Sequence, residues 1–391
     1  MIISKTVYTY EADDPAAALR ELERQLYSDG FVLRSQSVGL LFCDPEYVDT
    51  GVLQHVALSL PFPVAGATTF AQAVNGQTGQ MMLSLMVLTA DDVYFEVGQC
   101  SCATDSLQAA LQPEFDRAAS RLPEPPSLIF MFPPMQFGVP GNLYIDVMER
   151  ICPGVPQFGT MAVDDSMTFA RAATFQGACH MTDGLSFVLI SGSIAPQFII
   201  TTISESKGLT YVGEVTRAHS NRIIEINDMS AAKYFERIGL ARDGVMDDGV
   251  QFLPFKVDLK GRQDYDGVPV YRVVNALDKE GAAFSPGNID TGSVFRICSI
   301  DAQDVLLTTR RLAETINQLE NPGAVLMFSC TTRRTCFGAD LLKEAQALAE
   351  TVRPGLPVFM AYSGGEICPT SCEPGAVSNR YHNHSLITCI L

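Results

Sequence analysis

The sequence predicts an α/β protein with mixed, largely parallel sheets flanked by helices, built from repeated strand-helix-strand-strand units in two domains. Three observations predict this class. Short apolar runs are continuous rather than alternating, which is typical of strands covered on both faces. A helix-like segment separates two such runs at a spacing that suits a right-handed crossover between parallel strands. The same order of segments occurs three times along the 391 residues.

Each copy begins with an apolar strand, continues through a helix to a proline-led second strand that ends in small residues, and closes with a third apolar strand. The first copy comprises residues 38–43, 52–58, 63–68 and 81–88. The second comprises residues 127–132, 143–151, 156–160 and 185–190. The third comprises residues 324–329, 341–352, 357–362 and 385–391. We interpret the copies as a structural duplication, although a common motif can also recur by coincidence.

A different region, residues 209–291, separates the second copy from the third. It begins with a predicted strand pair, 209–215 and 221–226, followed by a helix over 231–238 that Ser230 can cap and Gly239 ends. Further strands are predicted at 270–274 and 294–300. A boundary near residues 206–208 divides the chain into domains of residues 1–207 and 208–391.

Two longer helices have recognisable ends. The helix over 15–26 has Pro15 in its first turn and Gly30 beyond its end. The helix over 301–319 begins at Asp301, whose carboxylate can accept the first free amides, and ends before Pro322. These signals fix where the two helices start and stop.

The composition argues against a nucleic-acid or membrane partner. The formal net charge is −17, and the adjacent basic pairs, Arg310-Arg311 and Arg333-Arg334, are isolated in an acidic chain. Nucleic-acid binders need clustered Lys and Arg to displace counterions from phosphates, and anionic membranes attract similar clusters. The apolar runs are too short to cross a bilayer as helices. We therefore expect no nucleic-acid partner and no membrane insertion.

The cysteines and the N-terminus indicate a cytoplasmic protein. The first residues lack the long apolar core of a signal peptide. Eleven cysteines are present, an odd number, and Cys43, Cys298 and Cys389 lie within apolar runs. A buried free cysteine behaves as a small hydrophobic residue, so we interpret most of them as reduced core residues.

Several motifs, taken in order, resemble the FIST family. In the N-terminal half, Leu-Phe-Cys at 41–43 and Pro-Val-Ala-Gly-Ala-Thr at 63–68 resemble the FIST N-terminal domain. The more specific motifs resemble the FIST C-terminal domain. They are Asn-Arg-Ile-Ile-Glu-Ile-Asn at 221–227 with the helix after it, Ile-Asp-Thr-Gly-Ser-Val-Phe-Arg at 289–296, Met-Phe-Ser-Cys at 327–330 followed by Arg333 or Arg334, Tyr-Ser-Gly-Gly-Glu-Ile at 362–367, and His-Asn-His-Ser-Leu at 382–386.

The resemblance covers nearly the whole chain and implies a sensory role. The family is implicated in binding small ligands such as amino acids, in signal-transduction proteins and in some F-box proteins, which is an inference by analogy. This sequence has Gly364 where the family usually carries an aromatic residue and Cys368 where it usually carries glycine. No F-box precedes the resembling region, and no kinase, cyclase or chemoreceptor segment follows it. We therefore expect the signal to pass through a separate partner protein.

Candidate ligand-binding residues lie where the predicted strands end. Ligands of open α/β sheets collect beyond the carboxyl ends of parallel strands. An arginine there can hold a ligand carboxylate through two hydrogen bonds, while Glu366 receives an ammonium group. The predicted ligand-binding residues are Thr68, Thr160, Cys330, Arg333, Arg334, Tyr362, Glu366, Asn379, His382 and Asn383. The structural alternative is that Arg333 or Arg334 pairs with Glu366 and holds loops together.

Small residues at the equivalent strand ends have two interpretations. Gly66 and Gly159 precede Thr68 and Thr160 at these ends. Their lack of a side chain permits close approach of a ligand or, as the preferred interpretation, close packing of a helix on the strand.

The cysteines and histidines of the C-terminal region suggest two other kinds of chemistry, metal binding and thiol catalysis. Its Cys and His residues lack the tight paired spacing of a zinc ribbon, so we predict no metal and no cofactor. Cys330 with His382 as a base would make a thiol enzyme, which requires a lowered thiol pKa and an oxyanion hole. We predict instead a non-enzymatic sensor of a small, amino acid-like ligand. A thiol enzyme near Cys330 and a protein-interaction scaffold remain the alternatives.

Overall fold

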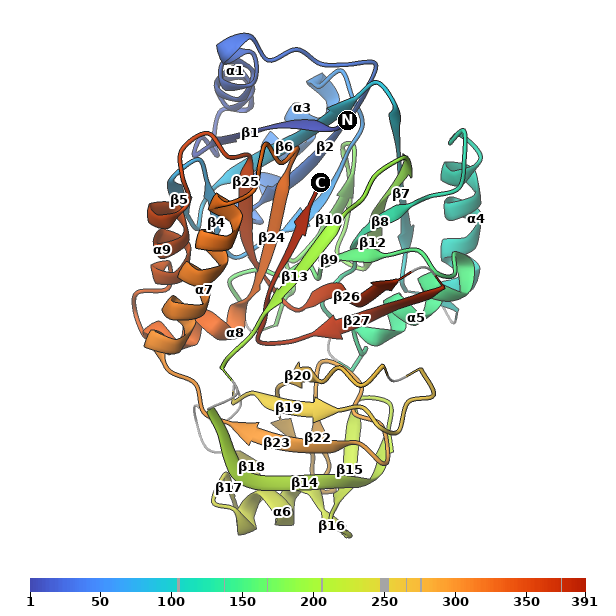
Figure 1. Ribbon diagram of the computed structural model, residues 1–391, viewed down its shortest axis with the longest axis vertical. Helices are drawn as coiled ribbons and strands as arrows, with labels where there is room; N and C mark the ends of the chain where they lie inside the picture. Colours follow the sequence, from blue (N-terminus) through green and yellow to red (C-terminus); the bar gives the residue numbers. More distant parts are fainter. Residues whose placement is uncertain are drawn as a thin grey trace.

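Three six-stranded sheets form a large body, and an eight-stranded sheet forms a smaller module beside it (Figure 1). The structure is a computed structural model that describes residues 1–103, 106–136, 138–166, 168–204, 207–246, 253–264, 266–274, 276–373 and 375–391. We call residues 208–298, from β14 to β23, the module, and the three other large sheets with their helices the body.

The first body sheet is drawn from the N-terminal half of the chain. Its order is β1 (Ile3–Thr9), β6 (Leu83–Ala90), β2 (Gln36–Cys43), β3 (Val64–Thr68), β10 (Thr174–Gln176) and β11 (Cys179–Met181).

The other two body sheets combine strands from both halves of the chain. The second has the order β27 (Ala376–His382), β26 (Glu366–Glu373), β9 (Gln157–Thr160), β8 (Leu128–Phe132), β12 (Gly184–Gly192) and β7 (Val93–Ser101). The third has the order β13 (Gln197–Thr201), β28 (Leu386–Ile390), β24 (Val325–Cys330), β25 (Val358–Ser363), β4 (Gln72–Val74) and β5 (Gln77–Gly79). The predicted boundary near 206–208 includes Ser206, which lies outside the described residues, and the division at 207/208 stays a prediction.

Helices cover the outer face of each body sheet. On the first sheet, α1 (Pro15–Leu26) and α3 (Val52–Ser59) share a core with β2 and β6, next to the short α2 (Glu46–Asp49). On the second, α4 (Leu107–Ala119) and α5 (Asn142–Ile151) pack against β8 and β12. On the third, α7 (Ala302–Asn317) and α9 (Lys343–Thr351) pack against β24 and β25.

The inner faces of the three sheets meet in one aromatic core. Phe42 of β2, Phe132 of β8 and Phe328 of β24 each come from the first strand of a predicted copy. The ring centroid of Phe42 lies 5.4 Å from that of Phe132 and 5.5 Å from that of Phe328, and both pairs are edge-on. Aromatic rings favour this geometry. Each first strand is therefore buried on both faces, between this core and a helix layer.

The prediction of mixed α/β sheets is confirmed, but the prediction that they are largely parallel is wrong. Among the described strands, the parallel pairs are β2 with β3, β8 with β9 and β24 with β25. The same three first strands pair antiparallel with β6, β12 and β28. A continuous apolar run indicates that both faces of a strand are buried. A sheet that lies between a helix layer and another sheet is buried on both faces whether its strands are parallel or antiparallel, so the run does not reveal the strand direction. Descent of the copies from one repeated unit stays an interpretation.

Two glycines allow neighbouring strands to approach each other. A Cβ atom on Gly66 would lie 1.7 Å from the carbonyl oxygen of Leu41, and one on Gly159 would lie 1.9 Å from that of Met131. Leu41 and Met131 belong to the parallel partner strands β2 and β8. The close contact is therefore with the backbone of the next strand, and the preferred interpretation, helix packing, is wrong.

The module consists of an eight-stranded antiparallel sheet, a short strand pair and, among its described residues, the α-helix α6. Its order is β20 (Val270–Arg272), β19 (Phe255–Asp258), β23 (Val294–Cys298), β14 (Gly208–His219), β15 (Arg222–Ile226), β22 (Ala283–Phe284) and β21 (Ala276–Leu277), with β16 (Met229–Ser230) beside β15. A separate pair is formed by β17 (Ala241–Arg242) and β18 (Val245–Met246). As predicted, Ser230 caps α6 (Ala231–Arg237), and its Oγ accepts the amide of Lys233.

The predicted starts of the two longer helices are confirmed. Pro15 lies in the first turn of α1, and the Asp14 carboxylate caps that helix. The Asp301 carboxylate accepts the amide of Asp304 at 2.8 Å at the start of α7. After β24 the chain turns at once into the short α8 (Thr331–Arg334), followed by a 3₁₀ turn over Thr335–Phe337. None of the helices described has the length and apolar character needed to span a membrane.

Candidate functional site

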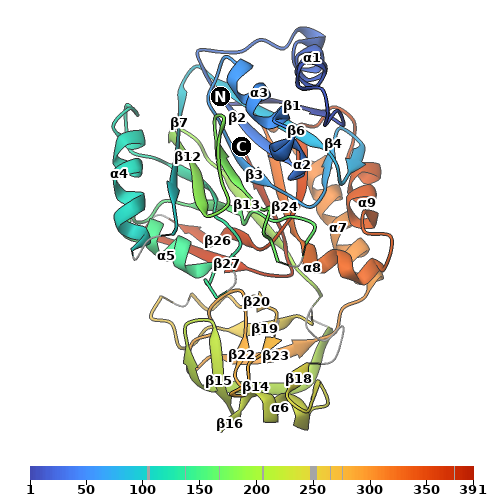
Figure 2. The same ribbon diagram turned by 180° about the vertical axis from the view of Figure 1, so that it is seen from behind.

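A cavity of about 540 Å³, here called the junction cavity, lies where the body meets the module. Strands β8, β9, β24 and β25 all end beside it, so it lies beyond the carboxyl ends of both parallel pairs. Figure 2 shows the module, seen from behind, below β24, β26 and β27. Its wall comes from three parts of the chain: Met135, Gln136, Val139, Asp164, Asp165 and Phe169; Asn221, Val273, Phe284, Ser285 and Pro286; and Cys330, Thr332, Arg334 and Asn383.

Other hollows of similar size contain none of the predicted residues. One of about 570 Å³ is lined by Ile3, Asp29 and Arg34, and one of about 560 Å³ is lined by Ile2, Gln197 and Leu391. Three predicted residues, Cys330, Arg334 and Asn383, line the junction cavity instead. It is therefore our candidate site.

Arg334 gives the junction cavity a positive charge that forms no ion pair within the described residues. Its guanidinium Cζ lies 2.9 Å from the centroid of the Phe70 ring. Its Nε and Nη1 are buried, and no hydrogen-bond acceptor reaches them within the described residues. Burial lowers the pKa of Arg334 to about 10, although Tyr362 and Asp165 act in the opposite direction. The group stays protonated at neutral pH, so a half-buried cation faces the cavity without a paired anion.

Asn383 adds an unused hydrogen-bond acceptor. Its side chain is almost fully buried in the turn between β27 and β28 and lines the cavity. Its Nδ2 donates to the hydroxyl of Tyr381 at 3.3 Å, while its Oδ1 has no donor in the described part of the chain. Buried polar atoms usually have partners, so the missing donor makes this oxygen a candidate contact for a ligand.

Cys330 lines the cavity, but its surroundings do not activate a thiol. Burial, with a contribution from Glu366, raises the pKa of Cys330 to about 12. The hydroxyl of Thr332 donates to its Sγ at 3.1 Å and lies 2.8 Å from Nδ1 of His384. The predicted base, His382, instead contacts the carbonyl oxygen of Cys368 at 3.0 Å. The geometry thus does not place His382 as a base for Cys330, and the raised pKa disfavours the thiolate that a nucleophile needs.

Arg333 points away from the cavity and into the body. Its Nη2 lies 2.7 Å from Oε1 of Glu344 on α9, and both side chains have no exposed surface. Glu344 also accepts hydrogen bonds from Thr309 and Ser329. This buried ion pair joins α7, α8, α9 and β24.

Glu366 is also buried outside the cavity lining. Burial raises the pKa of its carboxyl well above the ordinary range. Its oxygens accept hydrogen bonds from Ser385 at 2.9 Å and Ser363 at 3.4 Å. The structural alternative was an ion pair between Glu366 and Arg333 or Arg334. Within the described residues, Glu366 instead contacts the two serines, and Arg333 pairs with Glu344.

The remaining predicted residues make contacts inside the body. The Tyr362 hydroxyl accepts the amide of Ala345, and Thr68 Oγ1 accepts that of Ala173. Thr160 donates to the carbonyl of Gly365, and Asn379 bridges Gln157 and Glu149. These contacts and that of His382 hold neighbouring strands and loops in place, and none of the five residues lines the junction cavity.

The C-terminal Cys and His residues do not gather as metal ligands would. Among the residues described, no three His, Cys, Asp or Glu side chains are grouped closely enough to hold a metal ion.

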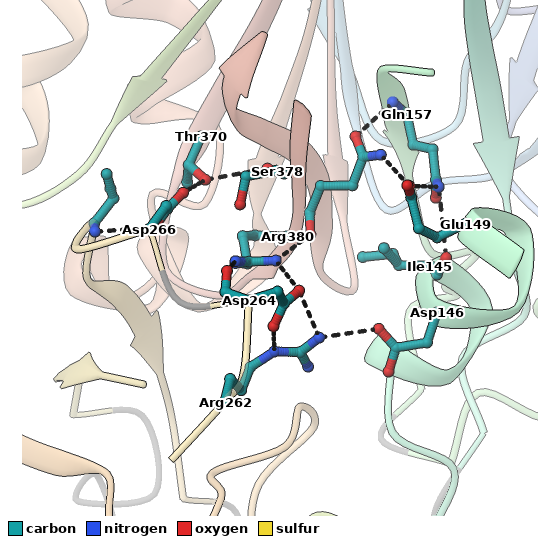
Figure 3. A network of polar contacts seen from close by, with 12 residues as sticks. Ile145, Asp146, Glu149, Gln157, Arg262, Asp264, Asp266, Thr370, Ser378 and Arg380 are labelled. Carbon is teal, nitrogen blue, oxygen red and sulfur yellow. Dashed lines mark hydrogen bonds and ion pairs between the residues drawn. The ribbon is translucent and has the colours of Figure 1, made fainter. Parts of the chain in front are cut away.

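A polar network fixes the module to the body on the side shown in Figure 3. Arg262 of the module contacts Asp264 at 2.8 Å and Asp146 of α5 at 3.3 Å. Asp264 also pairs with Arg380 of β27 at 2.9 Å. Burial alone would raise the pKa of Asp264, but the two arginines outweigh it and hold the pKa at about 2. We call these four residues the docking network.

Sequence reasoning missed the cavity residues outside the third copy. Met135 and Val139 follow β8, and Asp164 and Phe169 follow β9, so the rule applied to β24 and β25 would have found them in the second copy. Val273 and the residues after β22 lie in the module, and no motif marked them. Their role depends on how the module docks, which no local pattern reveals.

Comparison with known families agrees with the motifs. Residues 37–229 match the FIST N domain, and residues 221–369 match the FIST C domain. No curated protein matches the chain. FIST domains are in general sensory domains of signal transduction rather than catalytic domains. Because the two matches together span residues 37–369, the chain belongs to the FIST family, as its ordered motifs predicted.

Proposed function

We propose that this chain is a cytoplasmic ligand-binding sensory protein whose junction cavity takes an amino acid or a similar small carboxylate. The observation that carries the proposal is Arg334, a cation on the cavity wall that forms no ion pair among the described residues. A partly desolvated charge is costly until an opposite charge compensates it. A guanidinium offers a planar pair of donors that matches a carboxylate.

The position of the junction cavity supports a sensory use. Body residues such as Arg334 and module residues such as Phe284 face the same space, so a bound ligand contacts both parts. A ligand that binds best when the module is docked shifts the population towards that arrangement. A separate signalling partner then responds to the docked arrangement. Cys330, Arg334 and Asn383 are the predicted residues that contact the ligand in this proposal.

A thermal-shift panel tests the proposal. The purified protein is screened against the standard amino acids, small monocarboxylates and divalent metal ions. A ligand at a hundredfold excess over its Kd adds roughly 2.7 kcal/mol to stability, which is readily detected. We expect a saturable upward shift with a carboxylate-bearing compound, and we expect Arg334→Ala to abolish it.

The control is Arg310→Ala, which removes an exposed arginine of α7 and should leave the shift intact. A shift that survives in Arg334→Ala would contradict the proposed site. A shift given by metal ions alone, or by no carboxylate in the panel, would contradict the proposed ligand class.

A further inference from the structure

Two cysteines outside the junction cavity lie next to each other at the end of β7. Cys100 pairs with Leu185 of β12, and the antiparallel ladder continues for two more residues, because the amide of Cys102 donates to the carbonyl oxygen of Asp183 at 2.7 Å. Alternate residues of an extended strand point to the same face of the sheet. Both side chains therefore lie on the face that α4 and α5 cover, where Cys100 belongs to the core and Cys102 packs against it.

The two thiols form a hydrogen bond with each other. This hydrogen bond lowers the pKa of Cys100 and raises that of Cys102, while burial and the nearby carboxylates Glu114 and Asp183 oppose the effect on Cys100. A strongly coupled pair titrates as one unit, so this pair loses its first proton readily and keeps its second. The reactive form of a cysteine is the thiolate, which the pair therefore favours.

Other buried cysteines have the opposite tendency. Burial raises the thiol pKa of Cys43, Cys298, Cys330, Cys368 and Cys389. These residues behave as small hydrophobic side chains of the core, whereas the pair at the end of β7 has a partner that stabilises its charge.

A hollow of about 350 Å³ between the outer helices of the second sheet gives access to the pair. Its wall includes Cys102, Leu107 of α4, and Tyr144 and Val147 of α5. Cys102 is partly exposed, whereas Cys100 has only 5% of its surface exposed. The access therefore suits a small reagent that meets Cys102 first.

The hydroxyl of Tyr144 is a second polar group on the wall of this hollow. Tyr144 is 1% exposed, and its hydroxyl has no hydrogen-bond partner within the described residues. Burial raises its pKa, and Cys102 adds to that effect, so the hydroxyl keeps its proton beside the thiols. Buried polar atoms usually have partners, so the missing acceptor makes this O–H a candidate contact for a reagent at the sulfur atoms.

We infer that Cys100 and Cys102 form an oxidation site, at which a hydroperoxide converts the two thiols into a disulfide. The thiolate of the pair attacks one oxygen of the hydroperoxide, the O–O bond breaks, and a sulfenic acid forms. The other oxygen, which accepts a hydrogen bond from Tyr144, takes up the proton that the pair released and leaves as an alcohol, or as water when the reagent is hydrogen peroxide. The second thiol then attacks the sulfenic sulfur, the S–O bond breaks, and the hydroxyl leaves with the thiol proton as water. The two thiols lose two electrons, and the hydroperoxide gains them.

The strand geometry allows this disulfide. Two residues of an extended strand span about 6.6 Å, which is within the range of Cα separations that disulfides bridge. Cys102 also lies just after the last residue of β7, where the sheet restrains the backbone less. Disulfides of reducing compartments are usually transient and redox-sensing, and sensor cysteines typically combine a low pKa with a second cysteine beside them. The inference goes beyond the proposed function and does not depend on the junction cavity.

Peptide mapping after limited oxidation tests the inference. The reduced full chain is treated with hydrogen peroxide at neutral pH, quenched at intervals with iodoacetamide and digested with chymotrypsin. Cleavage after Phe95 and Leu107 gives a peptide in which Cys100 and Cys102 are the only cysteines. We expect this peptide to lose two hydrogens and to escape alkylation, and dithiothreitol to restore both thiols.

Exposed Cys179 is the internal reference for reactivity that depends on access alone. The thiolate fraction changes about tenfold for each unit of pKa, so we expect the pair to be oxidised at least about tenfold faster than Cys179. Oxidation of Cys179 before the pair, or conversion of the pair to sulfinic or sulfonic acid without a disulfide, overturns the inference.

Two variants test the separate roles. Cys102→Ser removes the second thiol and keeps a hydroxyl that can donate to Cys100, so we expect a sulfenic acid at Cys100 that dimedone traps. Absence of the trapped product overturns the role of Cys100 as the attacking sulfur. Tyr144→Phe removes a hydroxyl that has no partner in the described residues, and it should slow disulfide formation about three- to tenfold. An unchanged rate overturns the contact between that hydroxyl and the peroxide.

Discussion

At the scale of single residues, adjacent arginines have opposite environments. Arg333 lies fully buried against Glu344, whereas Arg334 lies half-buried on the Phe70 ring and faces the junction cavity. Successive residues of a helical turn point about 100° apart, so one enters the body when the other leaves it. The sequence alone gave both arginines the same expected role. Which one faces the cavity depends on Glu344 of α9, the buried partner of Arg333.

The buried pair predicts strong coupling between Arg333 and Glu344. Removing one partner leaves the other charge buried and uncompensated, which typically costs about 3–5 kcal/mol. We expect Arg333→Met or Glu344→Gln to lower the free energy of unfolding by about that amount. The double variant should lose less than the sum, because neither charge then remains. Urea denaturation of the four proteins measures the coupling.

Additive losses in that cycle would contradict the buried pair. The folded fraction of Arg333→Met should also keep the ligand affinity of the unmodified protein, since Arg333 does not line the cavity. Loss of affinity there would instead restore Arg333 to the binding site that its sequence position suggested.

His384 predicts a pH dependence of stability. Its ring is fully buried, and burial lowers its pKa to about 3, whereas an unfolded histidine titrates near 6.5. Below pH 6.5 the unfolded chain binds a proton that the folded chain does not bind. The contribution of neutral His384 is therefore complete above 6.5 and is lost as the pH falls towards 3, by up to about 1.4 kcal/mol per pH unit.

The variant His384→Asn isolates this effect, because asparagine tolerates the positive φ of 57° found at this position. We expect its unfolding free energy to fall less steeply than that of the unmodified protein between about pH 6.5 and pH 5. Exposed His219 gives the control variant His219→Asn, which removes an imidazole that is not buried. Parallel curves for His384→Asn would show that His384 takes up its proton in the folded state.

At the scale of elements, the sequence predicts helices and strands well and their directions poorly. Helix α1 and the capped start of α7 lie where Pro15 and Asp301 indicated, because capping is a local interaction. The direction of a neighbouring strand is not local. Phe42, Phe132 and Phe328 lie in continuous apolar runs because sheets and helices cover both faces, and the pairing of β2 with antiparallel β6 leaves no trace in such a run.

The candidate site was predicted in part, as the sheets were. The rule that ligands gather beyond parallel strands led to Cys330 and Arg334, and the polar segment before the last strand led to Asn383. These three residues line the junction cavity. The same reasoning also selected Glu366 and Tyr362, which do not line the cavity. Residues near a strand end point alternately to the two faces of the sheet, and only one face meets the cavity. Register across β24, β25 and β26 decides the face, and register depends on partners that are distant in sequence.

At the scale of the whole molecule, the module is attached to the body by the docking network and by a buried arginine. Arg380 has 2% of its side chain exposed, while its partner Asp264 has 57% exposed. Arg272 of the module is fully buried and donates to the carbonyl oxygen of Tyr381 at 2.7 Å. Both contacts involve β27, the strand that leads directly to Asn383. The position of the module is therefore linked mechanically to a residue of the cavity wall.

Asp264→Asn should loosen this attachment and weaken ligand binding through it. A half-exposed ion pair contributes up to about 1 kcal/mol, so the equilibrium constant for docking of the module should fall by up to about fivefold. The apparent affinity for a carboxylate ligand of the cavity should fall by no more than that factor. Hydrogen exchange should rise in β27 and around residues 259–264. Saturating ligand should reverse that rise, because a ligand that contacts Arg334 and Phe284 together stabilises the docked arrangement.

The matched control is Asp278→Asn, which breaks the Arg222–Asp278 pair within the module. The closest contact of that pair is 2.6 Å, and its loss should change neither ligand binding nor hydrogen exchange in β27. If Asp264→Asn behaves like this control, the cavity senses its ligand without movement of the module, and a partner must instead recognise the body itself.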